Sequence, residues 1–281
     1  MNFLKAVRKI LKLPLTLPMQ FAFVRRRMAF ELKQHWFSDL DLVVPLTDDF
    51  CCPIPELDSF FSFSEIFVTG EYGSLLQDIP LPARWIDLGC HTGYFTLYLA
   101  WQHALAGNTN WRSLLIDADP RMEKLAKATI KTNRLDGQCT ILSGLISRHE
   151  GERDFALRTG MGSSSDLDMT GVQAVKRVRT VSPAEILTVF PPPYDLIKVD
   201  IEGGEYDFLE HYTEVYTKAS FVLLEWHSPD REGAGGDRAR ELLTAHGFRF
   251  VKTVRPRREL YLEGNWYSSG VQLYERAAGA A

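Results

Sequence analysis

Short apolar runs alternate with amphipathic stretches through the middle of the chain. The runs resemble strands buried on both faces of a sheet and lie at residues 84–88, 113–117, 139–142, 194–201 and 220–225. Between them, residues 94–106 and 120–133 carry apolar side chains at helical spacing, and another helix is expected from Glu205. Strands that alternate with helices predict an α/β fold with a doubly wound, mostly parallel sheet.

The pattern changes after a glycine-rich loop at residues 233–236. A helix is expected at 238–246, where Gly247 provides a C-cap. Alternating apolar and polar residues at 248–252 and 266–274 then predict a C-terminal antiparallel strand pair at the sheet edge. We therefore place the main domain at residues 83–275 and a loose tail at 276–281.

Residues 1–82 form a predicted N-terminal extension, which prolines at 80 and 82 separate from the main domain. Its first 28 residues contain several lysines and arginines, no acid, and apolar residues at helical spacing. We favour a solvated helix that packs on the main domain. The alternative is a basic amphipathic helix in peripheral contact with an anionic membrane surface.

Composition and charge narrow the classes of function. The formal net charge of -4 and the pI near 6.0 give no support to nucleic-acid binding, which usually requires a basic domain. The four cysteines include no C-x-x-C pair, so a cysteine-rich zinc site is not expected. So few cysteines, together with the lack of a long apolar run, indicate a cytoplasmic protein, with residues 1–28 as the only candidate for contact with the inner membrane surface.

The first chemical motif is D-x-G-x-x-x-G, which ends one expected strand and opens the next helix. Glycines in such a loop allow a tight turn and a close approach of the backbone to a ligand. Ligands of open α/β sheets bind at the carboxyl ends of strands, so a binding loop is expected here. The alternative is a glycine turn without a ligand. The residues concerned are Asp87, Gly89, Cys90 and Gly93.

The second motif lies at the end of the second expected strand, where Asp117 and Asp119 flank Ala118. A carboxylate at this position is suited to accept hydrogen bonds from ribose hydroxyl groups. Either aspartate meets this requirement, and Asp119 also precedes Pro120 as a helix cap. Ser143, at the end of the third expected strand, joins the candidate ligand-binding residues.

The third motif follows the fourth expected strand and reads K-V-D-I-E-G-G-E from Lys198 to Glu205. Lys198, Asp200 and Glu202 alternate with apolar residues, so a strand would place them on one side. A buried strand does not tolerate three charges in this arrangement, which indicates that they emerge at its open end. The alternative is a structural ion pair of Lys198 together with acids at a helix N-terminus.

In this order, the motifs resemble the FkbM family of S-adenosylmethionine-dependent methyltransferases over residues 85–226. The resemblance implies a Rossmann-like class I methyltransferase fold with S-adenosylmethionine as cofactor. Cys90-His91 stand where the family usually has Ala-Asn, and Asp119-Pro120 where it usually has Glu-Pro. The elements that carry the resemblance are Asp87-x-Gly89-x-x-x-Gly93, Asp119-Pro120, Asn133, the Gly-Ser-Ser-Ser run at 162–165, and the motif at 198–205.

The resemblance implies O-methylation of a hydroxyl group on a sugar, a glycan or another small natural product. A base must then take the hydroxyl proton, and we expect His227 or Asp200 to do so, with Glu202 beside them. Lys198 would hold a carboxylate or a developing oxyanion. Asp200, Glu202, Glu205 and His227 also offer ligands for a divalent metal such as Mg²⁺, but we favour the metal-free interpretation.

Two rival functions remain at this stage. A nicotinamide oxidoreductase is disfavoured because the chain lacks G-x-G-x-x-G after the first strand. A non-catalytic assembly protein docked at a membrane would explain the basic N-terminus and the altered Cys90-His91 pair. The aromatic residues at 60–63 and the loop at 159–170 are expected to frame the acceptor pocket, although the aromatic residues also fit a core cluster.

Overall fold

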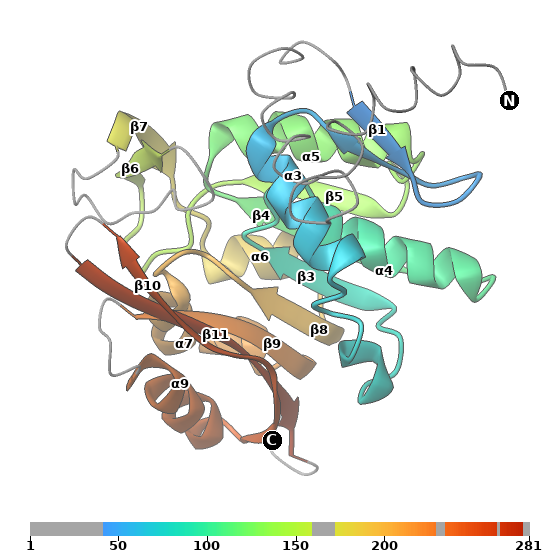
Figure 1. Ribbon diagram of the computed structural model, residues 1–281. Helices are drawn as coiled ribbons and strands as arrows, with labels where there is room; N and C mark the ends of the chain where they lie inside the picture. Colours follow the sequence, from blue (N-terminus) through green and yellow to red (C-terminus); the bar gives the residue numbers. More distant parts are fainter. Residues whose placement is uncertain (1–41, 159–171, 229–233, 263–264, 278–281) are drawn as a thin grey trace, which may run out of the picture.

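A seven-stranded sheet forms the centre of the structure (Figure 1). The computed structural model describes residues 42–158, 172–228, 234–262 and 265–277. The strands of this sheet are β3 (Arg84–Leu88), β4 (Arg112–Asp117), β5 (Cys139–Ser143), β8 (Tyr194–Val199), β9 (Ala219–Ser228), β10 (Phe248–Leu262) and β11 (Asn265–Arg276). They are arranged in the order β10-β11-β9-β8-β3-β4-β5.

The pairing of the strands confirms the predicted fold. The five strands from β9 to β5 are parallel, whereas β11 is antiparallel to both β9 and β10. From β3 the chain builds outward to β4 and β5, and it then returns to add β8 and β9 on the other side. This reversal makes the carboxyl ends of β3 and β8 the switch point at which open α/β sheets bind ligands.

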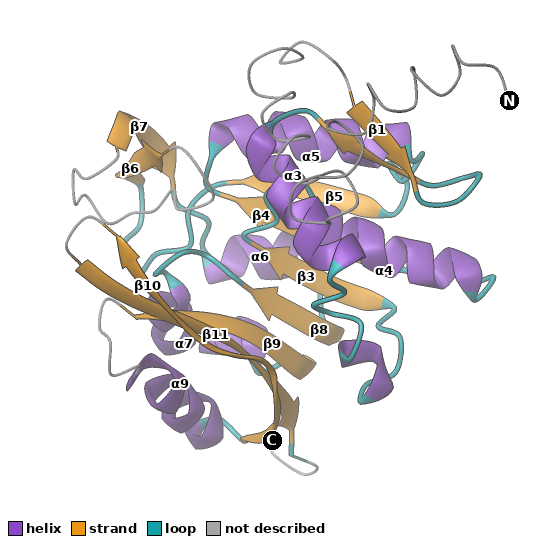
Figure 2. Ribbon diagram, in the orientation of Figure 1, coloured by secondary structure: helices purple, strands orange, loops and turns teal. Residues whose placement is uncertain are grey.

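Helices cover both faces of the sheet (Figure 2). Neighbouring residues of β3 belong to different cores: Trp85 packs with residues of one helix pair, and Ile86 packs with residues of the other four helices. This burial on both sides explains why the parallel strands are mostly apolar. The pair is α4 (Tyr94–Leu105) and α5 (Pro120–Thr132); the four are α6 (Pro183–Val189), α7 (Glu205–His211), α8 (Thr213–Tyr216) and α9 (Ala234–Ala245).

The lead-in to the sheet packs against α4 and α5. It consists of β1 (Leu42–Pro45), β2 (Cys51–Ile54), α3 (Leu57–Phe63), the π-helical turn η2 (Ser64–Val68) and the 3₁₀ turn η3 (Leu75–Gln77). β1 and β2 pair antiparallel. The buried Asn133 side chain connects β2 to the end of α5, because it accepts from the Cys51 N–H and donates to the Cys51 carbonyl, both at 2.9 Å.

Asn133→Ala should lower the free energy of unfolding by about 2 kcal/mol, because it leaves the backbone polar groups of Cys51 without partners in a half-buried position. Urea denaturation measures this loss. Lys131→Ala, at an exposed position near the end of the same helix, is the matched control and should stay within about 0.5 kcal/mol. Equal losses in the two variants would contradict this role for Asn133.

Several predicted boundaries were wrong. α9 begins at Ala234 instead of residue 238, because Gly235 and Gly236 allow the helix to pack directly against the Trp226 ring. β10 continues to Leu262 because β11 pairs with its whole length, and β11 continues to Arg276. The hairpin of β6 (Glu152–Arg158) and β7 (Val172–Arg179) was not predicted.

The expected helix at residues 1–28 and the loop at 159–170 lie outside the described residues. Among the helices that the structure does describe, none combines the length and the apolar character that a membrane span requires.

Candidate active site

The glycine loop after β3 fits tightly between the ends of two neighbouring strands. The N–H groups of Gly89 and Cys90 both donate to the Ile116 carbonyl at the end of β4, at 2.9 and 3.1 Å. On its other side, Gly89 approaches Asp200 so closely that an added Cβ atom would lie 1.6 Å from the Asp200 carbonyl oxygen. Gly89 also has a φ of +68°, which favours glycine. Backbone packing therefore requires a glycine here.

The two unusual residues of the loop differ in their surroundings. The Cys90 side chain is buried in the core beside α4, and burial raises the pKa of its thiol well above the ordinary value. His91 adopts a φ of +48°, and its ring Nδ1 lies 3.3 Å from the Thr92 hydroxyl and 3.4 Å from the Ser62 hydroxyl. Burial, aided by the nearby Lys198 charge, lowers the pKa of His91 to about 4, so the ring is neutral. The side chain of Cys90, predicted from the sequence to be a ligand-binding residue, faces the core, and only its backbone is left for such a contact.

The two aspartates of the second motif have distinct partners. Asp119 is the N-cap of α5: it accepts from the Arg121 N–H at 2.9 Å and pairs with the Arg121 guanidinium at 2.6 Å. Asp117 accepts from the His91 N–H at 2.7 Å and from the Asp119 N–H at 2.9 Å. Burial raises the pKa of Asp117 to about 6, although these two hydrogen bonds act in the opposite direction. Asp117 therefore joins the glycine loop to the end of β4.

Ser143 lies next to Asp117, because the two residues are paired in the register of β4 and β5. The following residue, Gly144, donates its N–H to the Asp117 carbonyl at 2.9 Å. The structure thus brings together the ends of β3, β4 and β5, with the expected residues Gly89, Asp117 and Ser143 along one edge of the sheet.

Lys198 is buried between two carboxylates. Its Nζ atom lies 3.4 Å from Asp87 Oδ1 and 3.2 Å from Asp200 Oδ2, and it donates to the Gly89 carbonyl at 2.9 Å. Burial alone would lower the pKa of Lys198, but Asp200 and Asp87 together hold it above the usual value. Asp87 has no exposed surface and also accepts from the Thr96 hydroxyl at 3.0 Å. Asp87 therefore stabilises the charge of Lys198 from the buried side, and its own side chain is not exposed at the end of the sheet.

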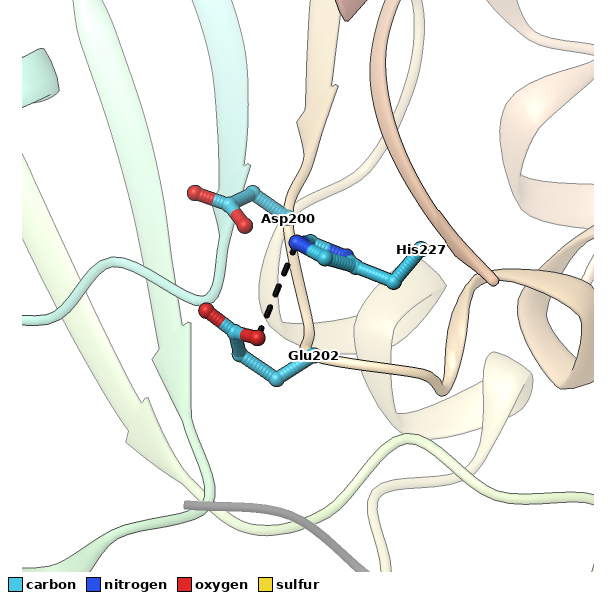
Figure 3. Close-up of side chains that lie close together, drawn as sticks. All are labelled: Asp200, Glu202 and His227. Carbon is cyan, nitrogen blue, oxygen red and sulfur yellow. Dashed lines mark ion pairs between the residues drawn. The ribbon is translucent and has the colours of Figure 1, made fainter. Parts of the chain in front are cut away.

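Asp200, Glu202 and His227 converge where β8 and β9 end (Figure 3). One potential ligand atom from each side chain lies within 4.8 Å of the other two, and His227 Nε2 is 3.6 Å from Glu202 Oε2. All three side chains are partly exposed, by 25%, 34% and 22% respectively. The third motif therefore emerges at the open end of its strand, and His227 joins it from β9.

Glu205 fixes the His227 ring of this cluster from its buried side. Its fully buried carboxylate accepts from the N–H groups of Ile201 and Gly203, and His227 Nδ1 lies 2.9 Å from its Oε1. Burial would lower the pKa of His227, but Glu202 and Glu205 raise it to about 10. Burial raises the pKa of Glu202 to about 7, against the influence of His227. The pKa of Asp200 is lowered, because Lys198 and His227 outweigh its burial.

An ionic network that the sequence did not suggest lies next to His227. Arg255 of β10 pairs with Glu71 at 2.9 Å and also with Glu225, and Glu225 Oε1 lies 3.5 Å from His227 Nε2. Arg258 lies 3.7 Å from Glu65 of η2. The only sign of this network in the sequence is the charged run around Arg255. That run does not show that Glu71 and Glu65, nearly 200 residues earlier in the chain, are partners.

The aromatic residues at 60–63 do not act as one group. Phe61 is exposed, whereas Phe63 stacks on Phe67 at a centroid distance of 5.6 Å and belongs to the core beside α4. Phe67 also contacts Tyr94 and Tyr98 of α4. For Phe63, the expected core cluster is therefore the better description.

Two of the solved structures that resemble this chain are methyltransferases. One is an O-methyltransferase of Bacillus cereus in complex with SAH (15% identity, TM-score 0.45). The match covers 75% of this chain and 81% of the Bacillus cereus chain. Another is a precorrin-6y C5,15-methyltransferase of Geobacter metallireducens (10% identity, TM-score 0.44; 74% and 88% covered). At this level of similarity, neither carries an argument about the chemistry of this chain.

No curated protein matches the sequence significantly. The model of the FkbM methyltransferase domain matches residues 87–250, which is more than half of the chain. The matched region runs from the start of the glycine loop into β10 and contains every residue of the Lys198, Asp200, Glu202 and His227 group. The chain belongs to the FkbM methyltransferase family.

Proposed function

We propose that this protein is an S-adenosylmethionine-dependent methyltransferase that methylates a hydroxyl group of a sugar, a glycan or another small natural product. The observation that carries the proposal is the contact between Gly89 and the Asp200 backbone. It sets the loop suited to a cofactor directly beside the carboxylates suited to an acceptor. The two halves of a transfer site thus meet at the switch point of the sheet.

The loop and its neighbours fit the proposed cofactor. Gly89 and Gly93 both have positive φ, so the loop can make the tight turn that places its backbone at the end of the sheet. Asp117, at the end of β4, is suited to accept hydrogen bonds from ribose hydroxyl groups. Asp119 is buried, and its carboxylate is occupied by the N-cap of α5 and the Arg121 guanidinium, whereas Asp117 keeps some exposed surface, so we assign the ribose contact to Asp117. When bound, S-adenosylmethionine supplies a methyl group on a positively charged sulfur.

The residues of the cluster can position a hydroxyl group and take its proton. Asp200 and Glu202 provide carboxylate oxygens, and Lys198 fixes Asp200 by the 3.2 Å ion pair. Correct placement of reacting groups can lower a barrier by about 7 to 11 kcal/mol, and a positioned base adds a further factor of about 10² to 10⁴. The oxygen of the acceptor forms the new bond to carbon, the sulfur keeps the electron pair of the broken bond, and a carboxylate of the cluster takes the proton.

The test combines calorimetry with a screen for the acceptor. S-adenosylhomocysteine should bind the full chain, and radiolabelled methyl donor should label a hydroxylated compound in a cell extract. Asp200→Asn should retain S-adenosylhomocysteine binding and lower turnover about 100-fold. Asp154→Asn, at an exposed position of β6, is the matched control and should leave both unchanged.

Three other results would contradict the proposed function or part of it. Full turnover in Asp200→Asn would contradict the acceptor site. Stabilisation by NAD alone would support an oxidoreductase, and the absence of binding to either ligand would support a non-catalytic protein.

Cofactor affinity should depend on pH through Asp117. A carboxyl group with a pKa of about 6 is protonated below that pH and then cannot accept hydrogen bonds with both oxygens. Affinity for S-adenosylhomocysteine should therefore fall as the pH drops from 7 through about 6. Asp117→Asn should bind weakly at every pH and lose this dependence, which calorimetry at several pH values measures. A wild-type affinity that stays constant down to pH 5 would argue against the assignment.

A further inference from the structure

We propose that Asp200, Glu202 and His227 bind one divalent transition-metal ion, with a preference for manganese or zinc. Its role in catalysis rests on the proposed methyltransferase function, but its binding does not. The sequence alone did not favour a metal. The structure changes this view because it places the His227 ring nitrogen of β9 close to the two carboxylates that follow β8.

The spacing of the three side chains suits a single ion. Two ligands that each lie about 2.1 Å from an ion are roughly 3.0 to 3.5 Å from one another, depending on the coordination geometry. The 3.6 Å between His227 Nε2 and Glu202 Oε2 is close to this range, and the third ligand atom lies within 4.8 Å of both. Small rotations of the partly exposed carboxylates would bring all three into contact with one ion (Figure 3).

The ring of His227 is already oriented as a metal ligand, and an ion would replace the proton that Nε2 carries when the imidazole is charged. Its Nδ1 is hydrogen-bonded to the buried Glu205 carboxylate at 2.9 Å, which leaves Nε2 directed toward Asp200 and Glu202. Glu205 is itself fixed by the N–H groups of Ile201 and Gly203. A carboxylate that holds the far nitrogen of a histidine is the usual outer partner of a metal-bound imidazole, since it fixes the tautomer and the orientation of the ring.

The charges around the cluster also favour a cation. Lys198 is shared between Asp87 and Asp200, and Arg255 between Glu71 and Glu225. Among the described residues, His227 is the only ion-pair partner of Glu202. Carboxylates thus outnumber the basic side chains, and a divalent ion would offset the excess negative charge.

The donor set indicates the type of ion and its use. Two oxygens and one imidazole nitrogen suit Mn²⁺ or Zn²⁺ better than Ca²⁺, which prefers oxygen ligands alone. Three protein ligands leave positions for water or for an oxygen of the acceptor. An ion in that place would lower the pKa of a bound hydroxyl group, and the proton would leave to water, because the carboxylates that bind the ion no longer act as the base. The bonds formed and broken at carbon and sulfur remain those of the proposed transfer.

The direct test uses full-length protein treated with a chelator, without any methyl donor. Titration with Mn²⁺, followed by electron paramagnetic resonance, should give one tight site per chain. Pulsed measurements should detect a nitrogen nucleus coupled to the ion. Glu202→Gln and His227→Gln should each weaken Mn²⁺ binding at least about 10-fold, and His227→Gln should remove the nitrogen coupling. Asp154→Asn is the control for surface acids and should bind like the wild type.

Circular dichroism and thermal unfolding of each variant verify that it is folded. If a glutamine variant does not fold, the nitrogen coupling in the wild type decides the question. Absence of a tight Mn²⁺ or Zn²⁺ site, or of nitrogen coupling, would overturn the inference. So would tight binding that persists in both folded variants.

Failure of the metal site can be distinguished from failure of the proposed function. Methyl transfer that continues at the full rate in EDTA, together with a missing Mn²⁺ site, would refute the metal and retain the methyltransferase. A specific Mn²⁺ site in a protein that binds no S-adenosylhomocysteine would refute the methyltransferase and retain the metal.

Discussion

Gly89→Ala should abolish the binding of S-adenosylhomocysteine and lower the free energy of unfolding by about 3 kcal/mol or more. The added methyl group would lie 1.6 Å from the carbonyl oxygen of Asp200 and 2.7 Å from its carbonyl carbon. Neither atom belongs to a flexible side chain, so the clash can be relieved only if the end of β8 moves away from β3. That movement would disrupt the Asp200 N–H hydrogen bond to the Leu88 carbonyl, which measures 3.2 Å.

Gly107→Ala separates the clash from backbone strain. Gly107 has a φ of +65°, nearly the same as the +68° of Gly89, but nothing lies within 4 Å of the Cβ atom that alanine would add there. Strain at positive φ alone should cost roughly 1 kcal/mol and leave ligand binding unchanged. Calorimetry with S-adenosylhomocysteine and urea denaturation compare the two variants. Equal effects in both would mean that the contact with Asp200 is not what requires glycine.

The central strands could be predicted from the sequence because their burial on both faces leaves a direct signal. β3 runs from Arg84 to Leu88, as its short, mostly apolar run predicts. α5 begins at Pro120, because Asp119 provides the cap and proline fits the first helical turn. These elements depend on local residues and on burial, and both are visible in a single sequence.

Elements that depend on a distant partner could not be predicted in this way. β7 is mostly exposed, and only its pairing with β6 makes it a strand. β10 continues through Arg255, Arg257 and Arg258 because β11 supplies hydrogen bonds along it. Its charged residues suggest a loop when β11 is not considered. The alternation of apolar and polar residues predicts only the first part of this strand.

The candidate site shows the same division. The order of the motifs placed Asp200 and Glu202 at a strand end, but it left Asp117 and Asp119 equivalent. The burial of Asp119 and its contacts at the start of α5, which depend on the folded chain, distinguish the two aspartates. Likewise, the sequence placed Glu205 on a helical turn, whereas its contact with His227 depends on the packing of α7 against β9.

Lys198→Met should lower the free energy of unfolding by about 3 to 5 kcal/mol, because it removes the cation from a buried group of carboxylates. Asp87 has no exposed surface, and burial already raises its pKa even with Lys198 in place. Without Lys198 that pKa should rise further. A carboxyl group whose pKa is higher in the folded than in the unfolded protein binds its proton more tightly when folded, so it lowers stability as the pH rises. The defect of Lys198→Met should therefore be largest at neutral pH and smaller in acid.

A double-mutant cycle and a surface control identify the cause of this loss. Asp87→Asn removes the buried charge, so the double variant with Lys198→Met should be less destabilised than the two single losses predict, by about 1 to 3 kcal/mol. Lys252→Met, which removes a partly exposed pairing with Asp78 and a hydrogen bond to the Ser74 carbonyl, should cost about 1 kcal/mol or less. Urea denaturation at neutral and acid pH measures these four variants and the wild type. Additive losses, or a Lys198→Met loss no larger than that of Lys252→Met, would show that Asp87 does not depend on Lys198 for its charge.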